Sequence, residues 1–89
     1  MKAFVTVIGK DRIGITANVC TLLAGHDANV LNISQSIMQD NFVMIMLVDL
    51  AACTASFEQL SEELEKAGQE MNLSIRIQRE DIFNAMHRI

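Results

Sequence analysis

The chain has 89 residues, of which 51% are hydrophobic and only 4% aromatic, and its formal net charge is −4. This length fits one small domain, and the acidic balance excludes the basic surface of a nucleic-acid-binding protein and disfavours anionic membranes. No apolar run reaches the roughly 20 residues of a membrane span and no signal-peptide pattern opens the chain, so we expect a cytoplasmic protein.

The N-terminal third predicts a strand, a sharp polar turn and a helix. Residues 2–9 are rich in Val, Phe, Thr and Ile, as in a strand. Residues 13–25 have helical periodicity, and Gly25 is the expected helix stop. The predicted apolar stripe of this helix consists of Ile13, Ala17, Cys20 and Ala24, flanked by Thr16 and Leu23.

The middle of the chain predicts a β-hairpin. Residues 29–39 alternate apolar and polar side chains, which is typical of a half-buried strand. Residues 42–49 are apolar on both faces, which indicates a strand that is covered on both sides. Asp40 and Asn41 lie between the two runs and predict a tight turn.

A second helix is predicted over residues 56–69. Ser56 and Gln59 have the spacing of a capping box, Thr54 is an alternative N-cap, and Gly68 is the expected end. The apolar stripe is Phe57, Leu60, Leu64 and Ala67. The acidic residues of this helix are expected to form a solvated face.

The last third ends in a strand over residues 73–79 and a short helix over about 81–89. The order is therefore β-α-β-β-α-β, with residues 2–9 and 42–49 central because they are the most continuously apolar. This order predicts an α+β, ferredoxin-like sandwich: a four-stranded antiparallel sheet of order 2-3-1-4, two helices on one face and a short C-terminal helix. We expect residues 1–89 to form a single domain.

The apolar content predicts self-association. Two helices can cover only one face of such a sheet, yet residues 42–49 present large apolar side chains to both faces. Burying each of these side chains stabilises by about 1.5–3 kcal/mol. We therefore expect a homodimer or higher homo-oligomer joined through a sheet face or a sheet edge.

The turn after the first strand is the best candidate for a ligand site. The strand-like run stops at Gly9, and Gly14 precedes the helix. A strand that turns sharply into a helix leaves free backbone N–H groups, which together with the helix dipole suit a carboxylate. Two simpler interpretations stay open: Asp11 caps the helix, or Gly14 only permits close packing.

Several motifs give the chain a family resemblance. They are VIGKDRIGI at 7–15, ANVL at 28–31, NISQS at 32–36, SIRIQ at 74–78 and IFNAMHRI at 82–89. With this element order, the chain resembles the ACT domain, a regulatory module that binds amino acids beside many metabolic enzymes. Within that family it resembles the short, free-standing members of the UPF0237 group.

The resemblance implies a ligand site where the loop after the first strand meets the second strand of a neighbouring subunit. The matching ligand-binding residues are Asp11, Arg12, Ile13, Gly14, Ile15 and Asn29. Many family members have Asn where this chain has Asp11, and the usual proline is replaced by Ile13. A carboxylate at position 11 attracts a ligand ammonium group but repels a ligand carboxylate, so Arg12 or the helix N-terminus would have to compensate.

The function that the resemblance implies is amino-acid binding by a homo-oligomeric regulatory module in the control of amino-acid metabolism. The alternative is an interaction module that docks on a metabolic enzyme or regulator without a ligand of its own. We expect no catalytic residues, metal or cofactor. The His26-Asp27 pair is expected in a surface loop, and Cys20 and Cys53 as reduced structural cysteines.

Overall fold

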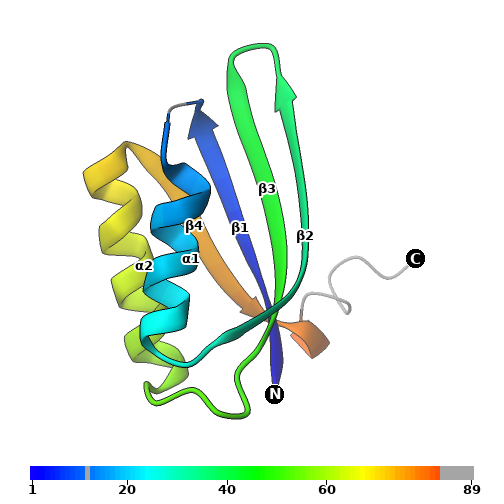
Figure 1. The fold of residues 1–89 in the computed structure, drawn as a ribbon, viewed down its shortest axis with the longest axis vertical. Helices are drawn as coiled ribbons and strands as arrows, with labels where there is room; N and C mark the ends of the chain where they lie inside the picture. The colour runs from blue at the N-terminus through cyan, green and yellow to red at the C-terminus, as the bar shows by residue number, and fades with distance from the viewer. Residues whose placement is uncertain (12, 83–89) are drawn as a thin grey trace.

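The computed structural model describes residues 1–11 and 13–82, which form a sheet with two helices on one face (Figure 1). The elements are β1 (Lys2–Lys10), α1 (Ile15–Gly25), β2 (Asn29–Met38), β3 (Asn41–Asp49), α2 (Phe57–Met71) and β4 (Leu73–Arg79). The sheet is antiparallel with the order β2-β3-β1-β4, so the predicted ferredoxin-like fold is confirmed. Of the predicted C-terminal helix, residues 81 and 82 are described and helical, and the remainder lies outside the described residues.

Burial in the sheet follows the two-residue period of its strands. Val5 pairs with Met46 on β3 and with Ile77 on β4, and all three are buried beneath the helices. The next residue, Thr6, pairs with Ile45, and both face the opposite side of the sheet. We call that side the open face, because within the described residues no helix lies on it. β3 is thus apolar on both faces, as predicted, but α1 and α2 cover only one of them.

The predicted apolar stripe of the first helix was wrong. α1 begins at Ile15, two residues later than expected, and buries Ile15, Val19 and Leu23. Ala17 and Ala24 are exposed instead. The branched side chains remove more apolar surface from water than alanines do, so they decide which face of α1 meets the sheet.

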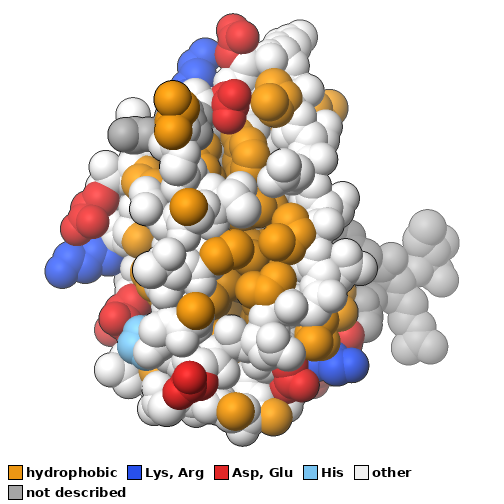
Figure 2. Space-filling view, in the orientation of Figure 1, with side chains coloured by type: hydrophobic (Ala, Val, Ile, Leu, Met, Phe, Trp, Pro, Cys, Tyr) orange, Lys and Arg blue, Asp and Glu red, His pale blue; other side chains and the backbone are white. Residues whose placement is uncertain are grey.

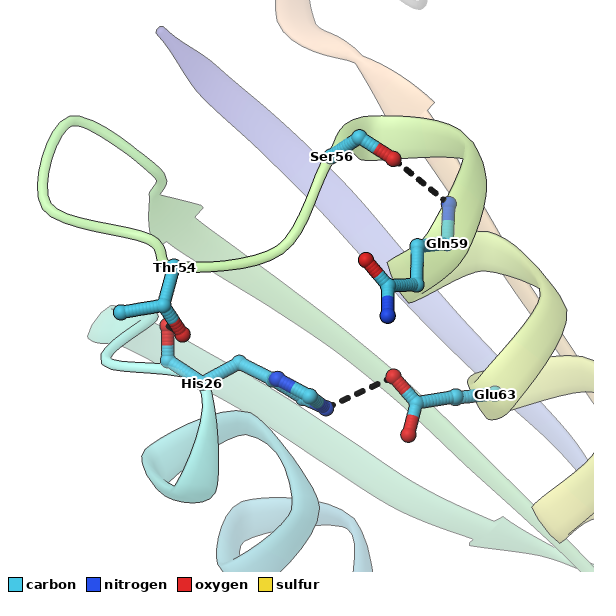
Figure 3. Close-up of polar contacts among 5 residues, drawn as sticks. All are labelled: His26, Thr54, Ser56, Gln59 and Glu63. Carbon is cyan, nitrogen blue, oxygen red and sulfur yellow. Dashed lines mark hydrogen bonds and ion pairs between the residues drawn. The ribbon is translucent and has the colours of Figure 1, made fainter.

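The start of α2 confirms the predicted cap. The Ser56 Oγ atom accepts a hydrogen bond from the Gln59 backbone N–H at 3.1 Å (Figure 3). The alternative cap, Thr54, has a different role, since its backbone N–H donates to the His26 carbonyl at 2.9 Å. Thr54 therefore joins the loop before α2 to the end of α1.

The other end of α2 corrects a prediction. Gly68 does not stop the helix but lies buried inside it, and α2 continues to Met71, where Asn72 takes a left-handed conformation with φ 61°. A Cβ atom at Gly68 would lie 2.8 Å from the Leu73 carbonyl oxygen. The glycine is therefore needed for the close approach of α2 to β4.

The hairpin turn lies one residue earlier than predicted. Gln39 and Asp40 form it, and Asn41 already belongs to β3, where it pairs with Met38. Gln39 takes the positive φ of 59° that the tight connection requires. β2 therefore ends at Met38 and β3 begins at Asn41, each one residue earlier than predicted.

We expect Gly68→Ala to lower the free energy of unfolding by about 1–3 kcal/mol, because the added methyl group collides with backbone that cannot move without separating α2 from β4. Gly25→Ala is the matched control. A Cβ atom at Gly25 meets nothing within 4 Å, so this variant should be unchanged or up to about 1 kcal/mol more stable. Urea denaturation measures both, and wild-type stability of Gly68→Ala would contradict the tight contact.

Candidate functional site

The loop between β1 and α1 is organised by Gly14. This residue has φ 90°, a left-handed conformation that other residues rarely adopt, and it is the N-cap of α1. The first amide bonded within the helix is that of Asn18, which donates to the Gly14 carbonyl at 2.9 Å. Among the described residues, the preceding amides of Ile15, Thr16 and Ala17 have no acceptor. Three N–H donors therefore open toward the loop at the positive end of the helix dipole.

Asp11 is the first residue of this loop but does not cap α1. Its backbone N–H donates to the Asp40 carbonyl at 3.1 Å, which ties the loop to the β2–β3 turn. The carboxylate is exposed and takes part in none of the hydrogen bonds found in the described part of the chain. The interpretation of Asp11 as a helix cap was therefore wrong, because Gly14 occupies the N-cap position.

The two isoleucines of the motif have opposite environments. Ile13 is fully exposed, at 101% of its reference surface, whereas Ile15 is 2% exposed and belongs to the core. Ile15 can therefore offer a ligand only its backbone amide. The Ile13 side chain is available to a ligand or to a second subunit, and Arg12 lies outside the described residues.

A polar contact extends the site from α1 to β2. The Thr16 hydroxyl lies 3.4 Å from Gln35 Oε1 and 3.8 Å from the Met44 sulfur. Ile33 and Ile37 flank Gln35 on the helix-facing side of β2, and Ile37 is 60% exposed. Figure 2 shows apolar side chains gathered beside α1, over β3 and β2. No sequence pattern marked Thr16 or Gln35 as candidates, because they lie 19 residues apart and only the fold brings them together.

Asn29 lies at the far end of the sheet from the loop. It pairs with Asp49, which in turn pairs with Lys2 at the start of β1. The loop follows Lys10, eight residues along β1, which corresponds to about 26 Å of strand. One chain therefore does not bring Asn29 to Gly14.

His26 and Asp27 lie in the turn after α1, as the sequence predicts, and His26 also contacts α2. Its Nε2 atom lies 2.7 Å from Glu63 Oε2 on α2, and its side chain is 23% exposed (Figure 3). The carbonyl of His26 also accepts the Thr54 amide. These contacts join the end of α1 to α2 and to the preceding loop, so the role of His26 is structural. Glu63 was expected on the solvated face of α2; its side chain is 43% exposed but also contacts His26.

The two cysteines are free thiols. Cys20 and Cys53 are both half-buried and pack against the hydrophobic core, as expected for structural cysteines. Residues 1–11 and 13–82 contain no group of three His, Cys, Asp or Glu side chains able to hold a metal ion. Neither described helix is long and apolar enough to span a membrane.

Comparison with known proteins identifies relatives of this chain by sequence and by fold. A family model for the ACT domain matches residues 3–78. A UPF0237 protein of Clostridium acetobutylicum is 51% identical over 89 residues, which is the full length of both chains. Among solved structures, an ACT domain protein from Streptococcus pneumoniae is 38% identical, with a TM-score of 0.82 and 93% of each chain covered.

A more distant similarity comes from a regulatory protein. The regulatory subunit of aspartate kinase from Thermus thermophilus, in its ligand-free form, is 26% identical with a TM-score of 0.68, over 89% of this chain and 51% of that one. ACT domains are typically small-molecule-binding regulatory modules in amino-acid metabolism. The match over residues 3–78 and the full-length identity show that this chain belongs to the ACT domain family, within its UPF0237 group.

Proposed function

We propose that the protein is a regulatory module that binds an amino acid and acts as a homo-oligomer in the control of amino-acid metabolism. The observation that carries the proposal is the loop at Gly14, where three amides at a helix N-terminus have no acceptor among the described residues and the exposed Asp11 carboxylate belongs to the same loop. The similarity to the regulatory subunit of aspartate kinase supports the same class of function. The free thiols fit a reducing, cytosolic location.

The loop offers complementary groups to both charged ends of an amino acid. The amides of Ile15 and Thr16, with the helix dipole, suit the ligand carboxylate. The exposed Asp11 carboxylate suits the ligand ammonium group. Gly14 has no side chain, so the ligand can approach the backbone closely. Arg12 and Ile13 complete the ligand set proposed on this loop.

A second copy of the chain would supply the missing Asn29. β2 is an edge strand of ten residues with no charged residue and no proline, so it lacks the usual features that prevent edge pairing. A two-fold axis through Ser34 would pair two β2 strands, and the irregularity between Val30 and Asn32 would then place Asn29 opposite Met38 of the second copy. Met38 is the last residue before the hairpin turn, and the Asp11–Asp40 hydrogen bond ties that turn to the loop. This pairing would also cover the exposed side chains beside Gln35.

The open face favours a second candidate function, that of an interaction module without its own ligand. Ile8 is 50% exposed there, and Ile45 is also exposed. A partner protein that covered this face would bury the apolar centre of the sheet. The ligand and oligomer experiments below separate the two functions.

An amino acid at about a hundred times its Kd should stabilise the fold by roughly 2.7 kcal/mol, so a thermal-shift screen of the amino acids will identify the ligand.

Asp11→Asn should weaken the binding of that amino acid about tenfold, because the ammonium group loses a charged partner. Asp27→Asn, which alters another exposed aspartate beyond the end of α1, should leave the Kd from calorimetry unchanged. A screen without any thermal shift, or equal Kd values for wild type and Asp11→Asn, contradicts the proposed site.

Ile37→Lys should convert the dimer into a monomer at micromolar concentration, because it places a charge at the proposed β2 interface while altering a side chain that the single chain leaves exposed. Ile8→Lys makes the same change at a similarly exposed position on the open face and should remain dimeric. Sedimentation velocity distinguishes the species. A monomeric Ile8→Lys together with a dimeric Ile37→Lys would move the interface to the open face, and a monomeric wild type would remove the dimer.

A further inference from the structure

A groove runs between α2 and β4, at the opposite edge of the sheet from β2. Its volume is about 520 Å³. One wall is a stripe of α2 formed by Ser61, Glu65 and Gln69, and the other is the strand from Leu73 to Gln78. The α2 residues recur every four positions, so they lie on one face of the helix and follow the strand along the groove. Figure 1 shows α2 on the side of the molecule away from β2.

The β4 side of the groove can form a backbone ladder. β4 is the second edge strand of the sheet, and among the described strands it pairs only with β1. In an antiparallel pair, each strand directs every second N–H and C=O group away from its partner. The seven residues of β4 therefore present about half of their backbone groups to the groove. An extended chain lying there could continue the sheet.

The charges around the groove define the chemistry of such a chain. Glu65 is the central residue of the α2 stripe, on the helix side of β4. Arg76 is the central residue of β4 and faces the opposite side, since it pairs with Thr6 of the open face. Alternate side chains of an added strand would point to these two sides. A lysine or arginine toward α2, with an acidic or polar residue next to it in sequence, would complement both charges.

A second copy of this chain does not fit the groove. Pairing two β4 strands about a two-fold axis would place two α2 helices side by side. α2 carries five glutamates and a single lysine, so the helices would repel each other. The same pairing would bring two Arg76 side chains together when the axis passes through the middle of β4. The uncharged β2 edge suits self-association, whereas the β4 groove, with Glu65 on one side and Arg76 on the other, suits a different chain with complementary charges.

We propose that the groove between α2 and β4 binds an extended segment of another protein, which adds a strand to β4 and directs a lysine or arginine at Glu65. This mode of recognition takes affinity from backbone hydrogen bonds and specificity from alternate side chains. The surface is distinct from the Gly14 loop and from the β2 edge. The inference therefore does not rest on amino-acid binding, and either can fail without the other.

The test uses the full chain and four synthetic peptides, acetyl-Thr-Val-Thr-X-Thr-Val-Thr-amide, with Lys, Arg, Ser or Glu at X. Amide chemical shifts of isotope-labelled protein report both the affinity and the position of binding. We expect saturable shifts in β4 and α2, with a Kd of about 1 mM or tighter for the Lys and Arg peptides. The Ser peptide should bind more weakly and the Glu peptide weakest, about fivefold below Lys.

Two controls separate strand addition from general attraction of a basic peptide to an acidic protein. Glu65→Lys should weaken the Lys peptide about fivefold. Glu70→Lys makes the same charge change on α2, about 140° around the helix from Glu65, and should have little effect. The Lys peptide is also made with N-methyl groups on either its odd or its even residues. In a paired edge strand, only every second residue directs its N–H group at the neighbouring strand. N-methylation should therefore abolish binding in only one of these two peptides.

Four results would overturn the proposal. The first is the absence of saturable shifts with all four peptides up to about 5 mM. The second is an equal loss of affinity in Glu65→Lys and Glu70→Lys, which would indicate a general charge effect. The third is an equal effect of the two N-methylated peptides, and the fourth is a set of shifts centred on β2 or on the open face.

Discussion

The structure depends on the way two helices cover one face of a four-stranded sheet. Val5, Met46 and Ile77 lie in one row beneath them, and Gly68 lets α2 approach β4 more closely than a residue with a side chain would allow. Because α2 is held at the β4 side, the helix layer does not extend evenly over β2. Among the described residues, the helix-facing side of β2 therefore keeps apolar side chains exposed, and so does the open face, which neither helix covers. These two surfaces are where association is expected.

The two edges of the sheet differ in charge, and this difference separates their proposed partners. β2 has no charged residue along its ten positions and carries the exposed Ile37, so pairing with an identical strand has no electrostatic cost. β4 lies beside the glutamates of α2 and carries Arg76 on its other side. Identical edges of this kind would repel each other, whereas an extended segment with a lysine or arginine opposite Glu65 would be attracted. Self-association and recognition of another protein can therefore use opposite sides of one small domain.

The proposed ligand site is divided between chains for a geometric reason. Gly14 takes the left-handed conformation that turns β1 into α1, and α1 then runs back along the sheet before Asn29 opens β2. The βαβ connection places the loop, which follows β1, and Asn29, which opens β2, at opposite ends of the sheet. An antiparallel pair of β2 strands reverses that relation and would bring the two halves together. Ligand binding and assembly would then be coupled, because the ligand would contact both subunits.

The sequence by itself determined the element order, the strand order and the Ser56 cap, because strand periodicity, apolar continuity and capping chemistry are local properties that survive in the fold. It also located the Gly14 turn, since a glycine between a strand and a helix is a local signal. Only the tertiary structure decided which face of α1 is buried, that Gly68 lies within α2, and that His26 contacts Glu63. It also decided that Thr16 meets Gln35 while Asn29 lies at the far end of the sheet. These features depend on the packing of residues distant in sequence, and no local pattern records which distant neighbour a side chain will meet.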